Sequence, residues 1–129
     1  MHKGFLKTGF ILAVLSVALG AFAAHGLKTY VSSKAMDTFE TAVRYQFYHV
    51  VALIITAIIY KEFKFNIVKI AGWFFIAGII LFCGSLYLLA FKQGLVQPGF
   101  QWIGIITPFG GLSFITGWIL LFVSMYKGK

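Results

Sequence analysis

Residues 70–91 read IAGWFFIAGIILFCGSLYLLAF, and these 22 residues contain no Asp, Glu, Lys or Arg. An α-helix needs about 20 mostly apolar residues to cross the hydrocarbon core of a membrane. The segment therefore predicts a membrane-spanning helix, which we place at residues 69–91.

Three further runs without charged side chains occupy residues 8–27, 45–60 and 93–126. The run at 45–60 reaches membrane length only if the helix begins near Ala42 and the Arg44 head group extends to the lipid surface. The run at 93–126 starts with a cluster of Gln, Gly and Pro, which favours a loop followed by one span. We therefore expect an all-α bundle of four transmembrane helices in a single domain, residues 1–129, with spans at about 5–25, 42–60, 69–91 and 102–125.

The composition of the whole chain agrees with this prediction. Of 129 residues, 60% are hydrophobic and 11% are charged, and the mean hydropathy is +0.93. Soluble domains have about a quarter of their residues charged, and a chain this short cannot bury so much apolar surface in its own core. The sequence thus indicates an integral membrane protein and excludes a disordered chain.

The net charge of +8 is explained by basic residues that flank the spans. No basic run with interleaved aromatic residues stands outside a span, so we expect the lipid bilayer, and no nucleic acid, as partner. Seven basic residues fall on the side of the two termini, namely Lys3, Lys7, Lys61, Lys64, Lys69, Lys127 and Lys129. Four fall on the opposite side, namely Lys28, Lys34, Arg44 and Lys92. This excess predicts a bacterial inner-membrane protein with both termini in the cytoplasm.

The first span leaves an alternative open. Lys3 and Lys7 precede a hydrophobic stretch that ends in Ala21-Phe22-Ala23, which is also the pattern of a cleaved secretory signal. The apolar stretch is near the upper length limit for such a signal, so we favour a retained helix.

Residues 28–44 form the one sizeable polar segment between spans. Ser32 and Ser33 are candidate N-caps, and apolar residues recur at helical spacing from Ala35 to Val43. We predict an amphipathic helix at about residues 33–44 that runs directly into the second span. We interpret its apolar stripe as an anchor that lies on the outer membrane surface.

Polar and helix-breaking residues gather in the outer halves of all four predicted spans. The candidate polar layer or ligand-binding site consists of His25, Arg44, Tyr45, Tyr48, His49, Ser85, Tyr87 and Thr107. Candidate helix-packing or kink positions are Ser16, Gly20, Ala24, Gly84, Pro108, Gly110, Gly111, Ser113 and Gly117. Polar groups inside a membrane cost free energy unless they are paired. The layer is therefore either a pocket open to the outer leaflet or a hydrogen-bonded network that fixes helix register.

The sequence gives little support for catalysis or a cofactor. His25 and His49 are the one pair considered as axial haem ligands, but no other haem signature accompanies them. Too few His, Cys and acidic residues are present for a structural metal, and the few carboxylates are not paired for acid–base chemistry. We expect no catalytic residue, no metal and no cofactor.

Several blocks of this sequence resemble one known family. The blocks are GAFAAHGL at 20–27, TAVRYQFYH at 41–49, GSLYLLA at 84–90, TPFGG at 107–111 and Gly117-Trp118. Together they resemble the domain-of-unknown-function 423 family, which consists of small four-span inner-membrane proteins of bacteria and is similar to transmembrane protein 256 of animal mitochondria. The resemblance implies a retained first helix and supplies no biochemical function.

Three function classes follow from these observations. The first is a non-enzymatic interaction or assembly factor that packs against another membrane protein or a second copy of itself. The second is a binding module for a lipid, quinone or other amphiphile in the outer-leaflet polar layer. The third is a small oligomeric channel or carrier, which needs several copies to line a path.

Overall fold

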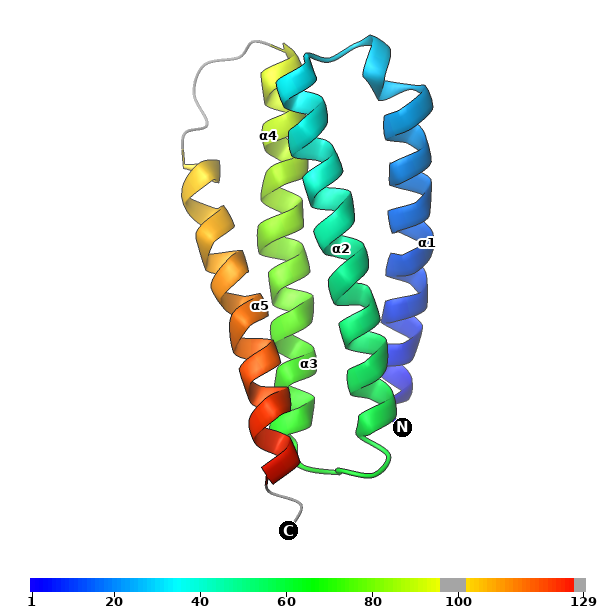
Figure 1. Cartoon of the computed structure of the whole chain (residues 1–129), viewed down its shortest axis with the longest axis vertical. Helices are drawn as coiled ribbons and strands as arrows, with labels where there is room; N and C mark the ends of the chain where they lie inside the picture. Colours follow the sequence, from blue (N-terminus) through cyan, green and yellow to red (C-terminus); the bar gives the residue numbers. More distant parts are fainter. Residues whose placement is uncertain (96–101, 127–129) are drawn as a thin grey trace.

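The computed structural model describes residues 1–95 and 102–126, and within these ranges the chain is helical with no strand (Figure 1). The helices are α1 (Lys3–His25), η1 (Leu27–Thr29), α2 (Ser33–Ile59), α3 (Asn66–Gly78), η2 (Ile79–Cys83), α4 (Gly84–Leu95) and α5 (Ile103–Tyr126). Four helical segments are long and apolar enough to cross a membrane. The predicted four-span, all-α architecture is confirmed.

The third span contains an irregularity that the sequence did not predict. Residues Ile79–Cys83 form a five-residue π-helix between α3 and α4, and the three segments run on as one rod. A π-helical turn holds an extra residue, so it changes the direction in which the following side chains point.

Consecutive spans run in opposite directions, and both termini lie at the same end of the bundle (Figure 1). Helix α1 packs along α2, while α5 packs chiefly along α3 and η2. Figure 1 shows α5 beside α3 near the end with the termini and leaning away from α4 at its other end. The divergence of α5 from α4 determines where the groove described below lies.

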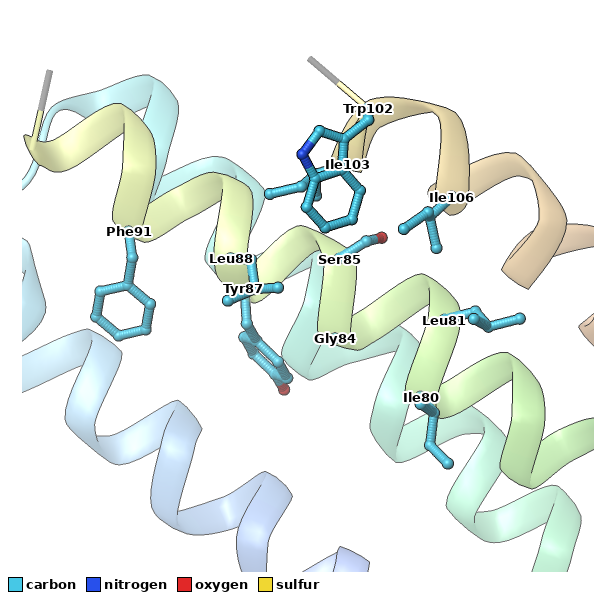
Figure 2. A pocket seen from close by; sticks show the side chains of 10 residues that line it. All are labelled: Ile80, Leu81, Gly84, Ser85, Tyr87, Leu88, Phe91, Trp102, Ile103 and Ile106. Carbon is cyan, nitrogen blue, oxygen red and sulfur yellow. The ribbon is translucent and has the colours of Figure 1, made fainter. Parts of the chain in front are cut away.

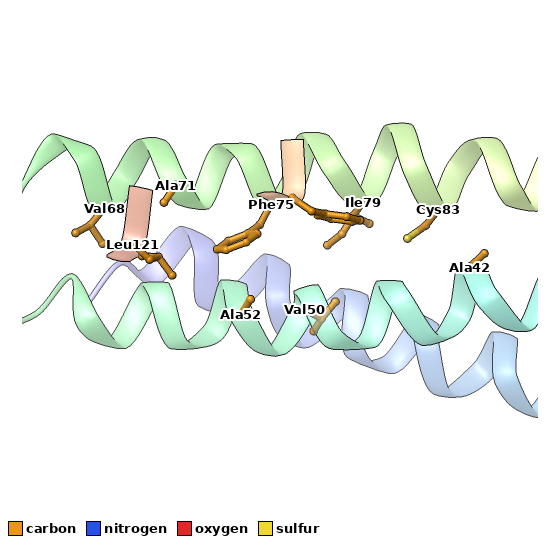
Figure 3. Packing of buried hydrophobic residues seen from close by; sticks show 10 residues of the cluster. Ala42, Val50, Ala52, Val68, Ala71, Phe75, Ile79, Cys83 and Leu121 are labelled. Carbon is orange, nitrogen blue, oxygen red and sulfur yellow. The ribbon is translucent and has the colours of Figure 1, made fainter. Parts of the chain in front are cut away.

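The core joins α2 to the third span through apolar side chains. Figure 3 shows Val68, Phe75 and Ile79 of the third span facing Val50 and Ala52 of α2, and all five are buried. Aromatic rings fill the spaces left by glycines on neighbouring helices. A Cβ on Gly72 would collide with the Phe5 ring, and one on Gly117 would lie 2.8 Å from the Phe75 ring. Small residues let membrane helices approach closely, and here large rings occupy the gap.

The segment 33–44 is helical and runs into the second span, as predicted, but it is not a separate surface helix. It forms the first part of the 27-residue α2, which is about 40 Å long. Ser32 caps it by accepting a hydrogen bond from the Ala35 backbone N–H at 3.2 Å. Ala35, Phe39 and Ala42 are fully buried.

The interpretation of this apolar stripe as a membrane-surface anchor is therefore wrong. The Phe39 ring contacts Phe22 of α1 and Tyr87 and Phe91 of α4, with ring centroids 5.0–6.4 Å apart. Because α2 continues without a break, the stripe follows the same helix face that binds α1 and α4.

Candidate functional site

One hydrogen-bonded network ties α1, α2 and α4 together. The Tyr87 hydroxyl donates to Gln46 Oε1 at 2.8 Å, and Gln46 Nε2 donates to the Leu12 carbonyl at 3.3 Å. The Ser16 hydroxyl donates to the same carbonyl at 2.8 Å. Ser16 and Gln46 are buried. These residues act as a polar cross-link between three helices, with donors and acceptors matched.

A second polar contact joins the third and fourth spans. The hydroxyls of Ser85 and Thr107 are 2.6 Å apart, and Ser85 also donates to the Phe82 carbonyl at 2.9 Å. Every fully buried side-chain nitrogen and oxygen in the described ranges has a hydrogen-bond partner. The pairing supports a network that fixes helix register at this depth.

His49 lies in an aromatic stack rather than in either polar contact. Its ring is parallel to Phe114 of α5, with an interplanar angle of 8° and centroids 3.4 Å apart. Phe75 and Trp118 flank it at 6.0 and 6.3 Å. Ring atom Nδ1 lies 2.8 Å from the Tyr45 carbonyl. His49 thus connects α2 to α5 across the third span.

Four candidate side chains make none of these hydrogen bonds. His25, Arg44, Tyr45 and Tyr48 are exposed on the surface of the bundle. His25 lies at the end of α1, whereas His49 lies about 24 Å from the start of α2 at the same end. The two histidines are therefore far apart along the bundle axis and cannot hold one haem within a single chain.

The predicted packing positions also divide into two groups. A Cβ on Gly110 would collide with the Phe82 backbone, so this glycine marks a close helix contact, while a Cβ on Gly20 would make ordinary contact with Val43 at 3.5 Å. By contrast, Ala24 and Pro108 are exposed, and the hydroxyl of the half-buried Ser113 bonds the Phe109 carbonyl of its own helix. Gly111 is half-buried, and a Cβ there would only approach Phe82 to 3.9 Å.

A groove opens on the lipid-facing side between the η2–α4 segment and α5. Its volume is about 440 Å³, and it is lined by Ile80, Leu81, Gly84, Ser85, Tyr87, Leu88, Phe91, Trp102, Ile103 and Ile106. Figure 2 shows Ser85 pointing towards Ile106 of α5, with Trp102 at one end of the groove. A Cβ on Gly84 would have no atom within 4 Å. The space beside Gly84 is therefore unfilled, because glycine has no side chain and no neighbouring residue occupies its place.

A family model described as "Protein of unknown function (DUF423)" matches residues 19–111. The UPF0382 membrane protein SH2409 of Staphylococcus haemolyticus is 43% identical over 125 residues, which cover 97% of each chain. The UPF0382 membrane protein YwdK of Bacillus subtilis is 40% identical over 126 residues, covering 97% of this chain and 98% of that protein. The chain belongs to the DUF423 family.

The DUF423 match confirms the resemblance read from the sequence blocks, and it makes this chain a membrane protein of a family with unknown function. A UPF0382 membrane protein of Haemophilus influenzae is 41% identical over 130 residues, 100% of this chain and 98% of that protein. No solved structure matches the chain at a significant level. All candidate polar residues of this DUF423 protein lie inside the matched range.

Sequence reasoning missed two features of the site in this DUF423 protein. Gln46 is the centre of the polar network, but it was not among the candidate residues. The Phe114 ring covers Gly78, so a Cβ on Gly78 would collide with it. Gly78 is not among the predicted packing positions. A signal for Gln46 was present, because an amide in the middle of a span costs free energy unless it is bonded. No residue pattern pointed to the π-helix beside the groove.

Proposed function

We propose that this DUF423 protein is a non-enzymatic membrane protein that binds the apolar chain of an amphiphile, such as a lipid or an isoprenoid quinone. The proposed site is the groove between the η2–α4 segment and α5. The observation that carries the proposal is the groove itself, about 440 Å³ in volume and open sideways on the lipid-facing surface.

The lining of the groove suits a hydrocarbon chain. Ligand pockets have volumes of about 300–1,000 Å³ and are mostly apolar, with a small number of polar groups. Here the Ser85 hydroxyl already pairs with Thr107, so it presents little unmatched polarity to a ligand. Gly84 leaves the wall of the groove open, and Ile80, Leu88 and Ile106 supply aliphatic contact surface.

Two features support a binding role rather than a catalytic one. Catalysis needs a titratable or nucleophilic group that reaches the substrate. Cys83 is fully buried, and the described residues hold no group of three His, Cys, Asp or Glu side chains that could bind a metal ion. The groove lining contains no Asp, Glu, His, Lys or Arg.

A substitution at Gly84 tests the proposal. Gly84→Leu places an isobutyl group in the groove, where a Cβ has free space, so the bundle should still fold. Gly104→Leu is the matched control, because a Cβ on Gly104 also has no atom within 4 Å and Gly104 does not line the groove. Native mass spectrometry of full-length protein released from lipid nanodiscs reports the bound mass.

We expect a retained amphiphile mass in the wild type and in Gly104→Leu, and its loss in Gly84→Leu. A bare chain in the wild type, or equal retention in both variants, would overturn the proposal. The retained mass itself distinguishes a phospholipid from an isoprenoid quinone.

We also propose that the end of the bundle with the termini faces the cytoplasm of a bacterial inner membrane. The positive-inside rule supports this, because Lys61 and Lys64 lie in the connection between α2 and α3 at that end and Lys69 lies in the first turn of α3. In a Cys83→Ala background, Lys64→Cys should resist a membrane-impermeant maleimide in intact cells, while Lys28→Cys at the opposite end should react. The reverse pattern would contradict the orientation.

A further inference from the structure

His49 presents an unmatched hydrogen-bond acceptor at the surface of the bundle. A carbonyl oxygen only accepts hydrogen bonds, so the contact with the Tyr45 carbonyl requires Nδ1 to carry the proton. In the neutral ring, Nε2 then has a free lone pair. Although the residue is only 7% exposed, Nε2 has no hydrogen-bond partner among the residues that the structure describes. Since no fully buried side-chain atom lacks a partner, Nε2 must reach the surface.

This acceptor lies deep within the hydrocarbon region. His49 is about 15 Å from the Ile59 end of α2 and about 24 Å from the Ser33 end. Its stacking partner Phe114 lies midway along α5. At such a depth neither water nor a lipid chain supplies a hydrogen-bond donor. A donor for this atom would therefore have to come from another molecule that reaches the same depth.

The same surface of α2 carries two phenol donors. The side chains of Tyr45 and Tyr48 are 39% and 54% exposed, and their rings lie 6.0 Å apart. Neither hydroxyl has a hydrogen-bond partner in the described part of the chain. Tyrosine facing lipid normally sits at the headgroup level, where its hydroxyl is hydrated. Tyr48 instead directly precedes His49 in the sequence, well inside the span.

We propose that this surface, formed by Tyr45, Tyr48, His49 and Trp118, binds a second copy of the chain in the same orientation. A tyrosine hydroxyl of one copy donates to His49 Nε2 of the other, and the two-fold axis repeats the bond. Donor and acceptor occupy nearly the same depth on one helix, so two parallel copies match without a shift along the membrane normal. Hydrogen bonds between membrane helices drive such association.

Self-complementarity favours a second copy over an amphiphile as the occupant. The polar head of an amphiphile is held near the membrane surface, whereas this acceptor lies near mid-depth. The surface is also separate from the groove. Trp118 and the groove residue Ile106 are twelve positions apart on α5, which places them about 120° apart around the helix. The proposed dimer surface and the proposed ligand site can therefore be tested independently of each other.

Single-molecule photobleaching of full-length protein in liposomes, over a series of protein-to-lipid ratios, measures the dimer dissociation constant. The double variant Tyr45→Phe/Tyr48→Phe removes two oxygens from exposed side chains and keeps both rings. We expect its dissociation constant to rise on the order of tenfold, because each dimer loses two symmetry-related hydrogen bonds. The control Tyr30→Phe/Tyr126→Phe removes hydroxyls from exposed tyrosines outside the surface and should dimerise as the wild type.

Three results would overturn the proposal. In the first, the wild type is monomeric at every protein density. In the second, the double variant dimerises as tightly as the wild type. A small molecule bound to a monomer and lost in the double variant would assign the surface to a ligand instead. His49→Leu tests the acceptor directly. If His49→Leu does not fold because the stack with Phe114 is lost, the double variant Tyr45→Phe/Tyr48→Phe still tests the proposal. The Tyr45 and Tyr48 side chains are exposed, so their substitution should not affect folding.

Discussion

Glycines in two regions of this bundle have opposite surroundings. In the packed interior, Gly72 and Gly117 meet the rings of Phe5 and Phe75 from neighbouring helices, and Gly110 meets the Phe82 backbone. In the groove, Gly84 faces open space because α5 leans away from α4. The comparison teaches that a glycine in a span marks a helix contact only where a neighbour supplies a large residue at the same depth. Where no such residue exists, the glycine leaves space for lipid or ligand.

The largest expected loss of stability comes from adding a methyl group at a glycine that lies against a neighbouring helix. Gly110→Ala places a methyl group against the Phe82 backbone, which cannot rotate away as a side chain can. Overpacking of this kind costs about 3 kcal/mol. Reversible unfolding in mixed detergent and SDS micelles measures the change. Gly84→Ala is the matched control and should alter stability by less than about 0.5 kcal/mol. Equal losses of stability in Gly110→Ala and Gly84→Ala would contradict the distinction between a glycine at a helix contact and a glycine in the groove.

The next effect concerns the polar cross-link in the interior. Gln46→Leu leaves the buried end of Tyr87 without its acceptor and removes the bond to the Leu12 carbonyl. We expect a loss of about 2 kcal/mol in the unfolding free energy. A double-mutant cycle with Tyr87→Phe should give a coupling of about 0.6–1.7 kcal/mol, the range found for hydrogen bonds between membrane helices. Additive effects would show that the two side chains are not coupled.

The smallest effect is expected beside the groove. Ser85→Ala removes the hydroxyl that bridges to Thr107, and it should cost about 0.6 kcal/mol. Ser113→Ala serves as the control, because the Ser113 hydroxyl bonds only the Phe109 carbonyl of its own helix. The same unfolding assay compares the two variants. A loss at Ser113 as large as the loss at Ser85 would count against an interhelical role for the Ser85–Thr107 pair.

The sequence predicted the spans well because hydropathy reports contact with lipid. The predicted ends of spans one, three and four lie within a few residues of the helix ends. The second span was predicted to begin near Ala42, and the helix that contains it begins at Ser33, where the sequence predicted the helix at 33–44 that runs into this span. Charged residues at Lys34, Asp37 and Glu40 end the apolar run there, although the helix continues through them.

The site was predicted only in part, because sequence gives depth along a span but not the direction around it. Ser85 and Thr107, expected in one layer, do lie together. His25 and Arg44, expected in the same layer, are exposed instead. The π-helix Ile79–Cys83 adds to this difficulty, since it turns the side chains of α4 relative to those of α3. An interaction with a different membrane protein stays a prediction.

The most direct test of the groove uses a phospholipid with a photoreactive diazirine in its acyl chain. Full-length protein in bilayers that contain this lipid is irradiated, digested and mapped by mass spectrometry. The account predicts that crosslinks concentrate on groove residues at 80–91 and 102–106. Residues 115–122 of α5, which include the exposed Ile119 and Phe122, serve as the internal reference for ordinary lipid contact. Equal crosslinking of the two regions would contradict a binding groove, because it would show that lipids visit all exposed surfaces alike.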